Sequence, residues 1–187
     1  MPRAGLTPQT VTAAAAALAD REGAAALTLS RVAGQLGVRP PSLYNHIDGL
    51  DGLTRAVALD GINALADACR TAVMGRAGAD GLIAMARAYR AFAAAHPGVY
   101  PLTQIVRPGD AEYEASAARV LEPVLALLGS FGLADTARIH AARAVRSALH
   151  GFVMLEQQAG FGLDVDVDAS FEWMLRALVG GLSVDRA

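Results

Sequence analysis

The apolar residues of this chain recur at helical spacing almost from end to end. In the segment 51–74, for example, one helical face collects Leu53, Val57, Leu65, Cys69 and Val73. No stretch alternates apolar and polar residues in the way that a half-buried strand does. Glycine, proline and aspartate interrupt the helical pattern at intervals. The sequence therefore predicts an all-α fold.

The interruptions divide the chain into predicted helices. The clearest cover residues 8–22, 28–36, 41–47, 51–74, 81–95, 134–159 and 168–182. A shorter element is expected to end near Ile105, and another helix contains Pro123, which should kink or split it. Gly23 ends the first helix, and Gly37 is placed to take a left-handed turn after the second.

Composition indicates a cytoplasmic protein without a membrane partner. The chain has 187 residues, a hydrophobic content of 53% and a mean hydropathy of +0.34, but much of this is alanine. No uncharged run reaches the roughly 18 residues that a spanning helix needs. The single cysteine, Cys69, excludes an internal disulfide and fits a reducing compartment.

Charge is distributed unevenly along the chain. The net charge is −2; residues 1–47 carry four arginines and two acids (4 − 2 = +2), and residues 48–187 carry twelve arginines and sixteen acids (12 − 16 = −4). This asymmetry is mild, but it favours a nucleic-acid-binding module at the N-terminus.

The stretch GVRPPSLYNHIDGL, residues 37–50, is unusual in a chain so rich in alanine and leucine. With Gly37 in a turn, one set of apolar residues from both sides would share a core: Val32, Ala33, Leu36, Val38, Leu43 and Ile47. The small Ala33 allows the two helices to cross closely. Two helices joined by a tight turn that contains glycine are typical of a helix-turn-helix motif.

The polar residues of this stretch fall on the opposite face. Ser42, Tyr44, Asn45 and His46 can all form hydrogen bonds with phosphates or base edges. Pro41 suits the first helical position, and the exposed start of the helix would offer backbone N–H groups to a phosphate. The residues alone leave open a solvated helical hairpin with an exposed tyrosine.

The segment LTLSRVAGQLGVRPPSLYNHIDGLDGL closely resembles the DNA-binding region of the TetR/AcrR family of bacterial transcriptional regulators. The resemblance implies a three-helix DNA-binding domain, residues 1–47, followed by a helical effector-binding and dimerisation domain, residues 48–187. It implies DNA contact at Ser30, Pro40, Pro41, Ser42, Tyr44, Asn45 and His46, to which we add Thr28, Arg31 and Arg39.

Two positions depart from the family pattern. Family members usually have a lysine that contacts a phosphate where this chain has Leu50, with Asp48 and Asp51 beside it, so the electrostatic attraction to DNA should be weaker. The second half resembles the C-terminal class named for a Trp-His-Gly motif. His150 and Gly151 match that motif, but Arg146 stands at the tryptophan position.

The larger domain contains no recognisable catalytic set. Its histidines lack metal-ligand spacing, and no cofactor motif is present, so neither a metal nor a cofactor is expected. One face of helix 134–159 carries Arg143, Arg146, His150 and Met154, which could anchor a ligand in an apolar cavity. Salt bridges to acids elsewhere, or a solvated face, explain the same residues more simply. Other candidate cavity walls are Met85, Tyr89, Phe92, Tyr100 and Tyr113.

The leading prediction is a repressor that a small molecule releases from a pseudo-palindromic, double-stranded DNA operator. The alternative is a helical small-molecule-binding protein with weak or no specific DNA binding, and an enzyme is disfavoured. A homodimer is expected through the last two helices. Its candidate contacts are Ala144, Ala148, Gly151, Phe171, Leu175, Leu178 and Leu182.

Overall fold

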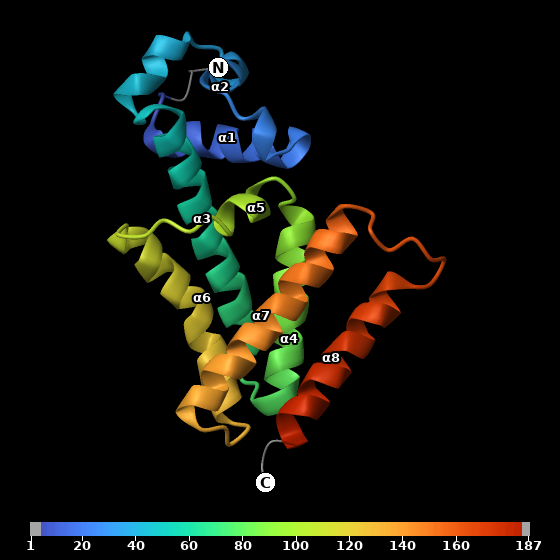
Figure 1. Cartoon of the computed structure of the whole chain (residues 1–187). Coiled ribbons are helices and arrows are strands. Elements are labelled where there is room, and N and C mark those ends of the chain that lie inside the picture. The colour runs from blue at the N-terminus through green and yellow to red at the C-terminus, as the bar shows by residue number, and fades with distance from the viewer. Residues whose placement is uncertain (1–4, 185–187) are drawn as a thin grey trace. The chain divides into compact units, whose positions relative to one another are not determined.

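A computed structural model describes residues 5–184, and within them every regular element is a helix (Figure 1). The elements are α1 (Pro8–Glu22), the 3₁₀ helix η1 (Ala24–Ala26), α2 (Leu29–Leu36), the 3₁₀ helix η2 (Pro40–Asn45), α3 (Gly49–Val73), α4 (Gly78–Ala95), α5 (Val99–Thr103), α6 (Ala111–Gly129), α7 (Asp135–Gln157) and α8 (Val167–Val184). The all-α prediction is confirmed. None of these helices is both long and apolar enough to cross a membrane.

The chain forms two compact units. The first consists of the described part of Met1–Ile62 together with His96–Tyr113, and the second of Asn63–Ala95 together with the described part of Glu114–Ala187. Helix α3 contributes residues to both. The units therefore divide the chain differently from the predicted boundary after residue 47. That the DNA-binding module ends at residue 47 stays a prediction.

Local capping fixes the ends of α1 and α2. The Thr7 hydroxyl accepts from the Thr10 N–H (3.1 Å), while the Thr10 hydroxyl accepts from the Thr7 N–H (2.9 Å). Such a reciprocal pair satisfies two backbone donors that a helix start otherwise leaves open. At the other ends, Gly23 and Gly37 take φ values of 85° and 67°. The predicted bounds of the first helix and the left-handed turn at Gly37 are confirmed.

Two proline-containing elements can be compared with their predictions. The third helix is a 3₁₀ helix of six residues rather than an α-helix, and 3₁₀ geometry is used in short pieces of this kind. Helix α6 continues through Pro123, so the helix is not split there, and a kink at this residue stays a prediction. The proline removes one backbone hydrogen bond, and the buried Leu127 and Leu128 hold the helix beyond it.

The first unit has its core beneath α2 and η2. Val32, Ala33 and Leu43 are fully buried, Ile47 is nearly so, and η2 packs on α2. These four residues were predicted to share a core, and their burial is confirmed. Two more predicted core residues, Leu36 and Val38, are only half-buried because they lie at the turn.

Helix α5 belongs to this unit because it is seated on α1 (Figure 1). The Asp20 carboxylate accepts the N–H groups of Gly98 (3.0 Å) and Val99 (2.9 Å), and its other oxygen lies 2.9 Å from His96 Nδ1. Backbone contact is so close that a Cβ on Gly98 would stand 1.8 Å from the Ala19 carbonyl oxygen.

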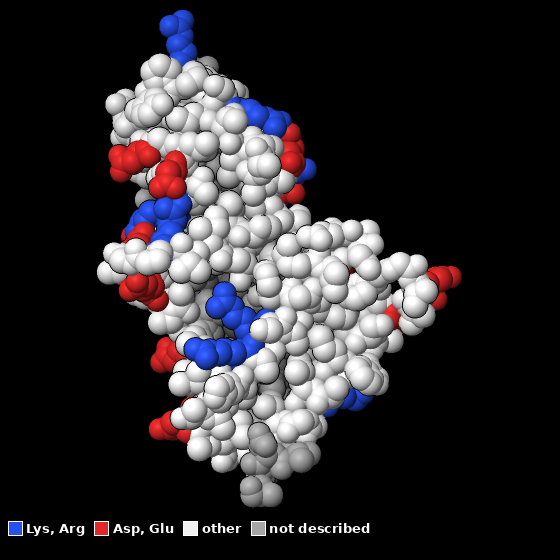
Figure 2. Space-filling model, in the orientation of Figure 1, with Lys and Arg blue, Asp and Glu red and all other residues white. Residues whose placement is uncertain are grey.

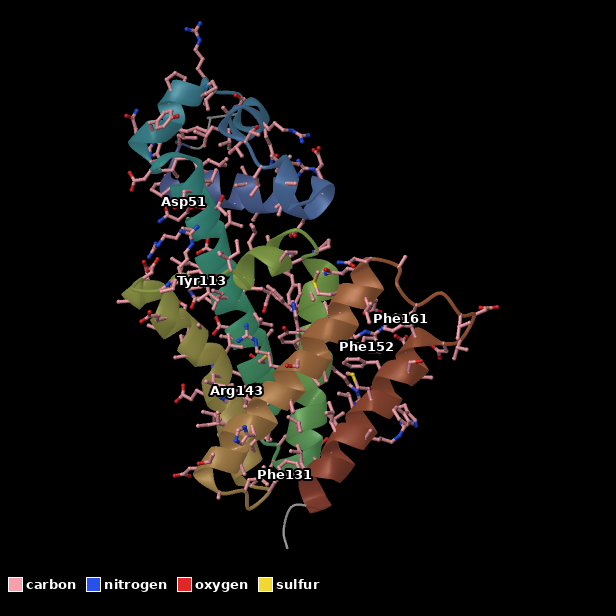
Figure 3. The ribbon with its side chains drawn as sticks, viewed as in Figure 1. Asp51, Tyr113, Phe131, Arg143, Phe152 and Phe161 are labelled. Atoms are coloured by element: carbon pink, nitrogen blue, oxygen red, sulfur yellow. The ribbon has the colours of Figure 1, made fainter. Side chains whose placement is uncertain are left out.

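The second unit is built around the packing of α4, α7 and α8. Arg90 of α4 donates to Glu156 of α7 (Nε–Oε2 2.9 Å) and pairs with Asp168 of α8 (2.7 Å). Its guanidinium also lies over the ring of Phe171, 4.7 Å from the centroid. Phe152 packs against both Phe171 and Phe161, so the same cluster holds the loop between α7 and α8 (Figure 3).

We predict that Gly98→Ala destabilises the protein, because the new methyl group meets backbone atoms of α1 rather than a movable side chain. Overpacking of this kind costs about 1–3 kcal/mol, and backbone collisions lie at the upper end. Gly34→Ala is the matched control, since a Cβ there meets nothing within 4 Å. Thermal unfolding followed by circular dichroism should show a lower midpoint for Gly98→Ala alone. Equal midpoints for the two variants would contradict the close packing of α5 on α1.

Candidate nucleic-acid interface and ligand site

The segment 40–47, here called the recognition segment, combines a buried anchor with an exposed polar face. Leu43 is fully buried, whereas the Tyr44 side chain is 61% exposed. The chain enters this segment with Arg39 extended (φ −84°, ψ 143°), as expected for a residue before proline. The segment ends with the His46 and Ile47 N–H groups both donating to the Leu43 carbonyl (2.8 and 3.1 Å).

All ten residues predicted to contact DNA are accessible in the first unit. Seven are exposed and the other three, Pro40, Ser42 and His46, are half-buried. The exposed ones are Thr28, Ser30, Arg31, Arg39, Pro41, Tyr44 and Asn45. They lie on α2 and its N-cap and on the recognition segment and the residue before it, so the helix-turn-helix geometry brings them together on neighbouring elements. Their contact with DNA stays a prediction.

One expected feature of this surface is not present. The start of the recognition segment was predicted to offer free N–H groups to a phosphate. Pro40 and Pro41 have none, and the Ser42 N–H donates to the Arg39 carbonyl (2.9 Å). The Pro40, Pro41 and Ser42 backbone therefore offers no free N–H group to a phosphate at this end.

Acidic partners moderate the positive charge of the surface. Arg31 pairs with Glu22, and Arg21 donates to the Gln35 side chain (2.9 Å). At the start of α3, Leu50 is 41% exposed where the family pattern has lysine. Arg107 lowers the pKa of the neighbouring Asp51 carboxyl by a hydrogen bond and by its charge, so this acid is ionised at neutral pH. That the attraction to DNA phosphates is weak here stays a prediction.

The predicted ligand residues do not form one environment. The apolar and aromatic ones are buried, whereas Arg143 and Arg146 are exposed, and His150 and Met154 are half-buried. The buried ones are Met85, Tyr89, Phe92, Tyr100 and Tyr113. Tyr100 and Tyr113 belong to the first unit, where the Tyr113 hydroxyl donates to the Ile105 carbonyl (2.6 Å).

Arg143 and Arg146 are exposed, which agrees with the interpretation of this side of the helix as a solvated face. Arg143 projects from the exposed side of α7 (Figure 3), so the cost of burying an unpaired arginine does not arise. Burial, and secondarily the charge of Arg146, lowers the pKa of His150 below its ordinary value. Its imidazole is therefore neutral at neutral pH, and the arginines carry the positive charge of this face. That these residues bind a ligand stays a prediction.

Two open grooves lie within the second unit, and none of the nine predicted ligand residues lines either. The larger, about 550 Å³, runs between the C-terminal part of α3 and α6. Its wall is formed by Arg70, Val73, Arg76, Ala77, Arg119, Glu122, Pro123, Ala126, Leu127 and Ser130. The smaller, about 420 Å³, lies beside the Arg90 cluster. The arginines of the larger groove are paired with Asp67 or Asp80, and the smaller groove is lined by three acids and two arginines, so neither groove carries a clear excess of positive charge.

Sequence reasoning missed one exposed aromatic residue. Trp173 is 67% exposed on α8, whereas Phe171 and Leu175 on the same helix are 1% and 3% exposed. The signal was present in the spacing, because residue 173 lies two positions from each and falls off their helical stripe. A large exposed aromatic side chain commonly marks an interaction surface.

Known proteins share both the sequence and the fold of this chain. The family model for the tetracyclin repressor-like C-terminal domain matches residues 82–178. An HTH-type transcriptional regulator of Mycobacterium tuberculosis, Rv0681, is 40% identical over 181 residues, which is 96% of this chain and 83% of that protein. The HTH-type regulator YobS of Bacillus subtilis is 35% identical over 185 residues, 98% of this chain and 96% of that protein.

A solved structure of a TetR variant from Acinetobacter baumannii, in complex with minocycline, has the same fold. It superposes with a TM-score of 0.75 at 24% identity and covers 98% of this chain and 99% of that one. The helical DNA-binding and C-terminal pattern, the family model and the two relatives agree. The chain belongs to the TetR family of DNA-binding transcriptional regulators.

Proposed function

We propose that this regulator is a homodimeric repressor that reads a pseudo-palindromic operator through its recognition segment and leaves it when a small molecule binds. The observation that carries the proposal is the pairing of a fully buried Leu43 with an exposed Tyr44 and Asn45. A core anchor fixes the backbone, so the polar side chains are presented without further ordering. Preorganised donors and acceptors are what base-edge recognition in a major groove requires.

The chemistry of the exposed residues supports sequence reading rather than simple attraction to DNA. Asn45 can form a bidentate contact with adenine, and Tyr44 and His46 can bond either phosphates or base edges. Few basic side chains surround them, and Arg31 is paired with Glu22. Affinity should therefore rest on specific contacts more than on counterion release. This distinguishes the proposal from the alternative of a ligand-binding protein with negligible specific DNA binding.

Dimerisation would place two recognition segments on one duplex. The exposed side chains of α7 and α8 include Leu155 and Trp173, with exposed fractions of 48% and 67%. Ala144 lies on the same face of α7 as Leu155, and Gly180 on the same face of α8 as Trp173, and both small residues would allow close helix packing. These exposed residues support the predicted dimer through the last two helices, but the residues that would contact the partner differ from those predicted. Phe171 and Leu175 are buried within the chain's own core and are not available to a partner.

The effector would be an amphipathic anion or hydrogen-bond acceptor. The exposed Arg143 and Arg146 donate hydrogen bonds and do not accept them. Release from DNA requires the effector and the operator to favour different conformations, and each then weakens the other's binding by the same factor. The related A. baumannii protein was solved with minocycline, which supports the effector role of this fold.

Tyr44→Ala combined with His46→Ala should abolish specific operator binding. Each base contact is worth about 1–3 kcal/mol, so affinity should fall roughly 30-fold or more. Fluorescence anisotropy on a labelled operator duplex measures the loss, and circular dichroism checks that helix content is unchanged. Met74→Ala with Leu163→Ala is the control, since both side chains are exposed outside the recognition segment. If the double variant keeps the operator affinity of the wild-type protein, DNA recognition through the recognition segment is wrong.

Trp173→Glu should convert the dimer to monomers, because a charge would be buried at the centre of the proposed interface without a partner. Met74→Glu is the matched control, with an exposed fraction of 68% against 67% for Trp173. Light scattering should give a halved mass for the first variant only. If both variants keep the dimer mass, the interface lies elsewhere on the chain.

A further inference from the structure

Two ion pairs join the start of α3 to the segment between α5 and α6. In one pair the arginine belongs to the segment, and in the other it belongs to α3. Arg107 of the segment donates to Asp51 of α3 through Nη1 (3.1 Å) and Nη2 (2.8 Å). In return Arg55 of α3 donates to Asp110 of the segment through Nε (2.6 Å) and Nη2 (2.7 Å). Both pairs are bidentate, the geometry in which an arginine–carboxylate contact is most directional.

The four residues of these pairs are well placed to fix one element on another. Asp51 and Arg55 are four residues apart and so lie on the same face of α3. Arg107 and Asp110 are the first and last residues of the RPGD turn. Figure 2 shows this flank with arginine side chains (blue) enclosed between acidic ones (red), and Figure 3 labels Asp51 on α3 and Tyr113 at the start of α6. Because each element contributes one cation and one anion, the turn has one favourable orientation on α3.

The segment is also held at its other end. Asp20 of α1 accepts hydrogen bonds from the backbone N–H groups of Gly98 and Val99. Gly61 of α3 packs closely against Val99 and Thr103, and a Cβ added at Gly61 would stand 2.6 Å from the Val99 side chain. Residues 96–113 are therefore fastened to α1 at one end and to the first two turns of α3 at the other. This fastening explains why they form one compact unit with the N-terminal helices.

The chain passes between the two units three times, at residues 62/63, 95/96 and 113/114. A body tied to the rest of a molecule through one helix can still rotate, whereas three separate connections restrict its orientation. The second and third connections have this effect only while residues 96–113 stay attached to the helices that present the recognition segment. Without the ion pairs, orienting each recognition segment on its half-site would cost additional conformational entropy.

We propose that Asp51–Arg107 and Arg55–Asp110 are positioning pairs for operator recognition: they make residues 96–113 part of the DNA-reading unit and so fix the orientation of the recognition segment. The inference rests on the proposed function, since it presumes an operator. It assigns a role in DNA binding to four residues outside the helix-turn-helix surface. Arg55 also pairs with Glu112 (2.8 Å), which adds to the attachment of the segment.

These pairs should respond to salt rather than to physiological changes of pH. The Arg55 guanidinium lowers the pKa of Asp110 to about 2, and Arg107 lowers that of Asp51 below its ordinary value. A carboxyl with a depressed pKa contributes stability above its unfolded pKa, roughly 3.9, and loses it only as the pH falls toward the folded value. Both pairs are consequently intact between pH 5 and 8, and ionic strength is the variable that weakens them.

The test exchanges the charges of one pair in the full-length dimer: Asp51→Arg, Arg107→Asp, and the two together. The single changes alter the net charge by +2 and −2, and the double change leaves it as it was. If only charge near the DNA mattered, the single variants would shift operator affinity in opposite directions. If the pair positions the recognition segment, both single variants should lose about fivefold or more, and the double variant should recover most of that loss.

Anisotropy with operator and with a scrambled duplex of equal length gives the ratio of specific to nonspecific affinity for each variant. Asp51→Asn provides a milder variant, without like-charge repulsion, in case Asp51→Arg does not fold. Reduced ratios in both single variants and recovery in the exchange support the inference. Unchanged ratios, opposite shifts, or an exchange that is folded by circular dichroism but not restored would overturn it. Failure of the wild-type chain to prefer any operator would instead refute the proposed function.

Discussion

The burial of Leu43 is the contact on which the DNA-reading surface depends. Most of the recognition segment is the six-residue 3₁₀ helix η2, with prolines at its first two positions, so its own backbone hydrogen bonds hold it weakly. Fixing it requires a side chain that reaches the core, and Leu43 does so beside Val32 and Ala33. Removing that anchor would leave Tyr44 and Asn45 exposed but no longer oriented.

Charged side chains outside this core attach α5 and the RPGD turn to the N-terminal helices. The Asp20 carboxylate caps the start of α5, and two arginine–carboxylate pairs attach the RPGD turn to α3. None of these contacts lies on the DNA-reading face. Their effect is to define which parts of the chain move together, and that is the property a ligand-responsive regulator must control. Polar contacts at the periphery therefore determine the size of the unit that reads DNA.

The sequence predicts what depends on near neighbours. Thr7, Thr28, Gly23 and Gly37 act within one or two turns of a helix, and the ends of α1 and α2 follow from them. The core positions of α2 and the recognition segment also follow from spacing alone. The 3₁₀ geometry was missed because apolar spacing over only six residues does not distinguish a 3₁₀ helix from an α-helix.

The contacts that the sequence did not predict join residues that are distant along the chain. Asp20 binds N–H groups 78 and 79 residues away, and Arg107 binds an acid 56 residues away, and neither pairing has a local signature. The exposure of Arg143 and Arg146, and the burial of Leu175 in the chain's own core, depend in the same way on which helices pack together. Periodicity identifies an apolar stripe but does not say whether a neighbouring helix or a second subunit covers it.

The central claim is that this chain recognises a specific DNA sequence through a dimer of core-anchored recognition segments. Footprinting of genomic fragments that the purified protein retains tests it most directly. The account predicts one protected, pseudo-palindromic sequence whose half-sites are separated by about one helical turn or a multiple of it. Fragments without a shared protected sequence, or protection that is the same on scrambled DNA, would contradict it.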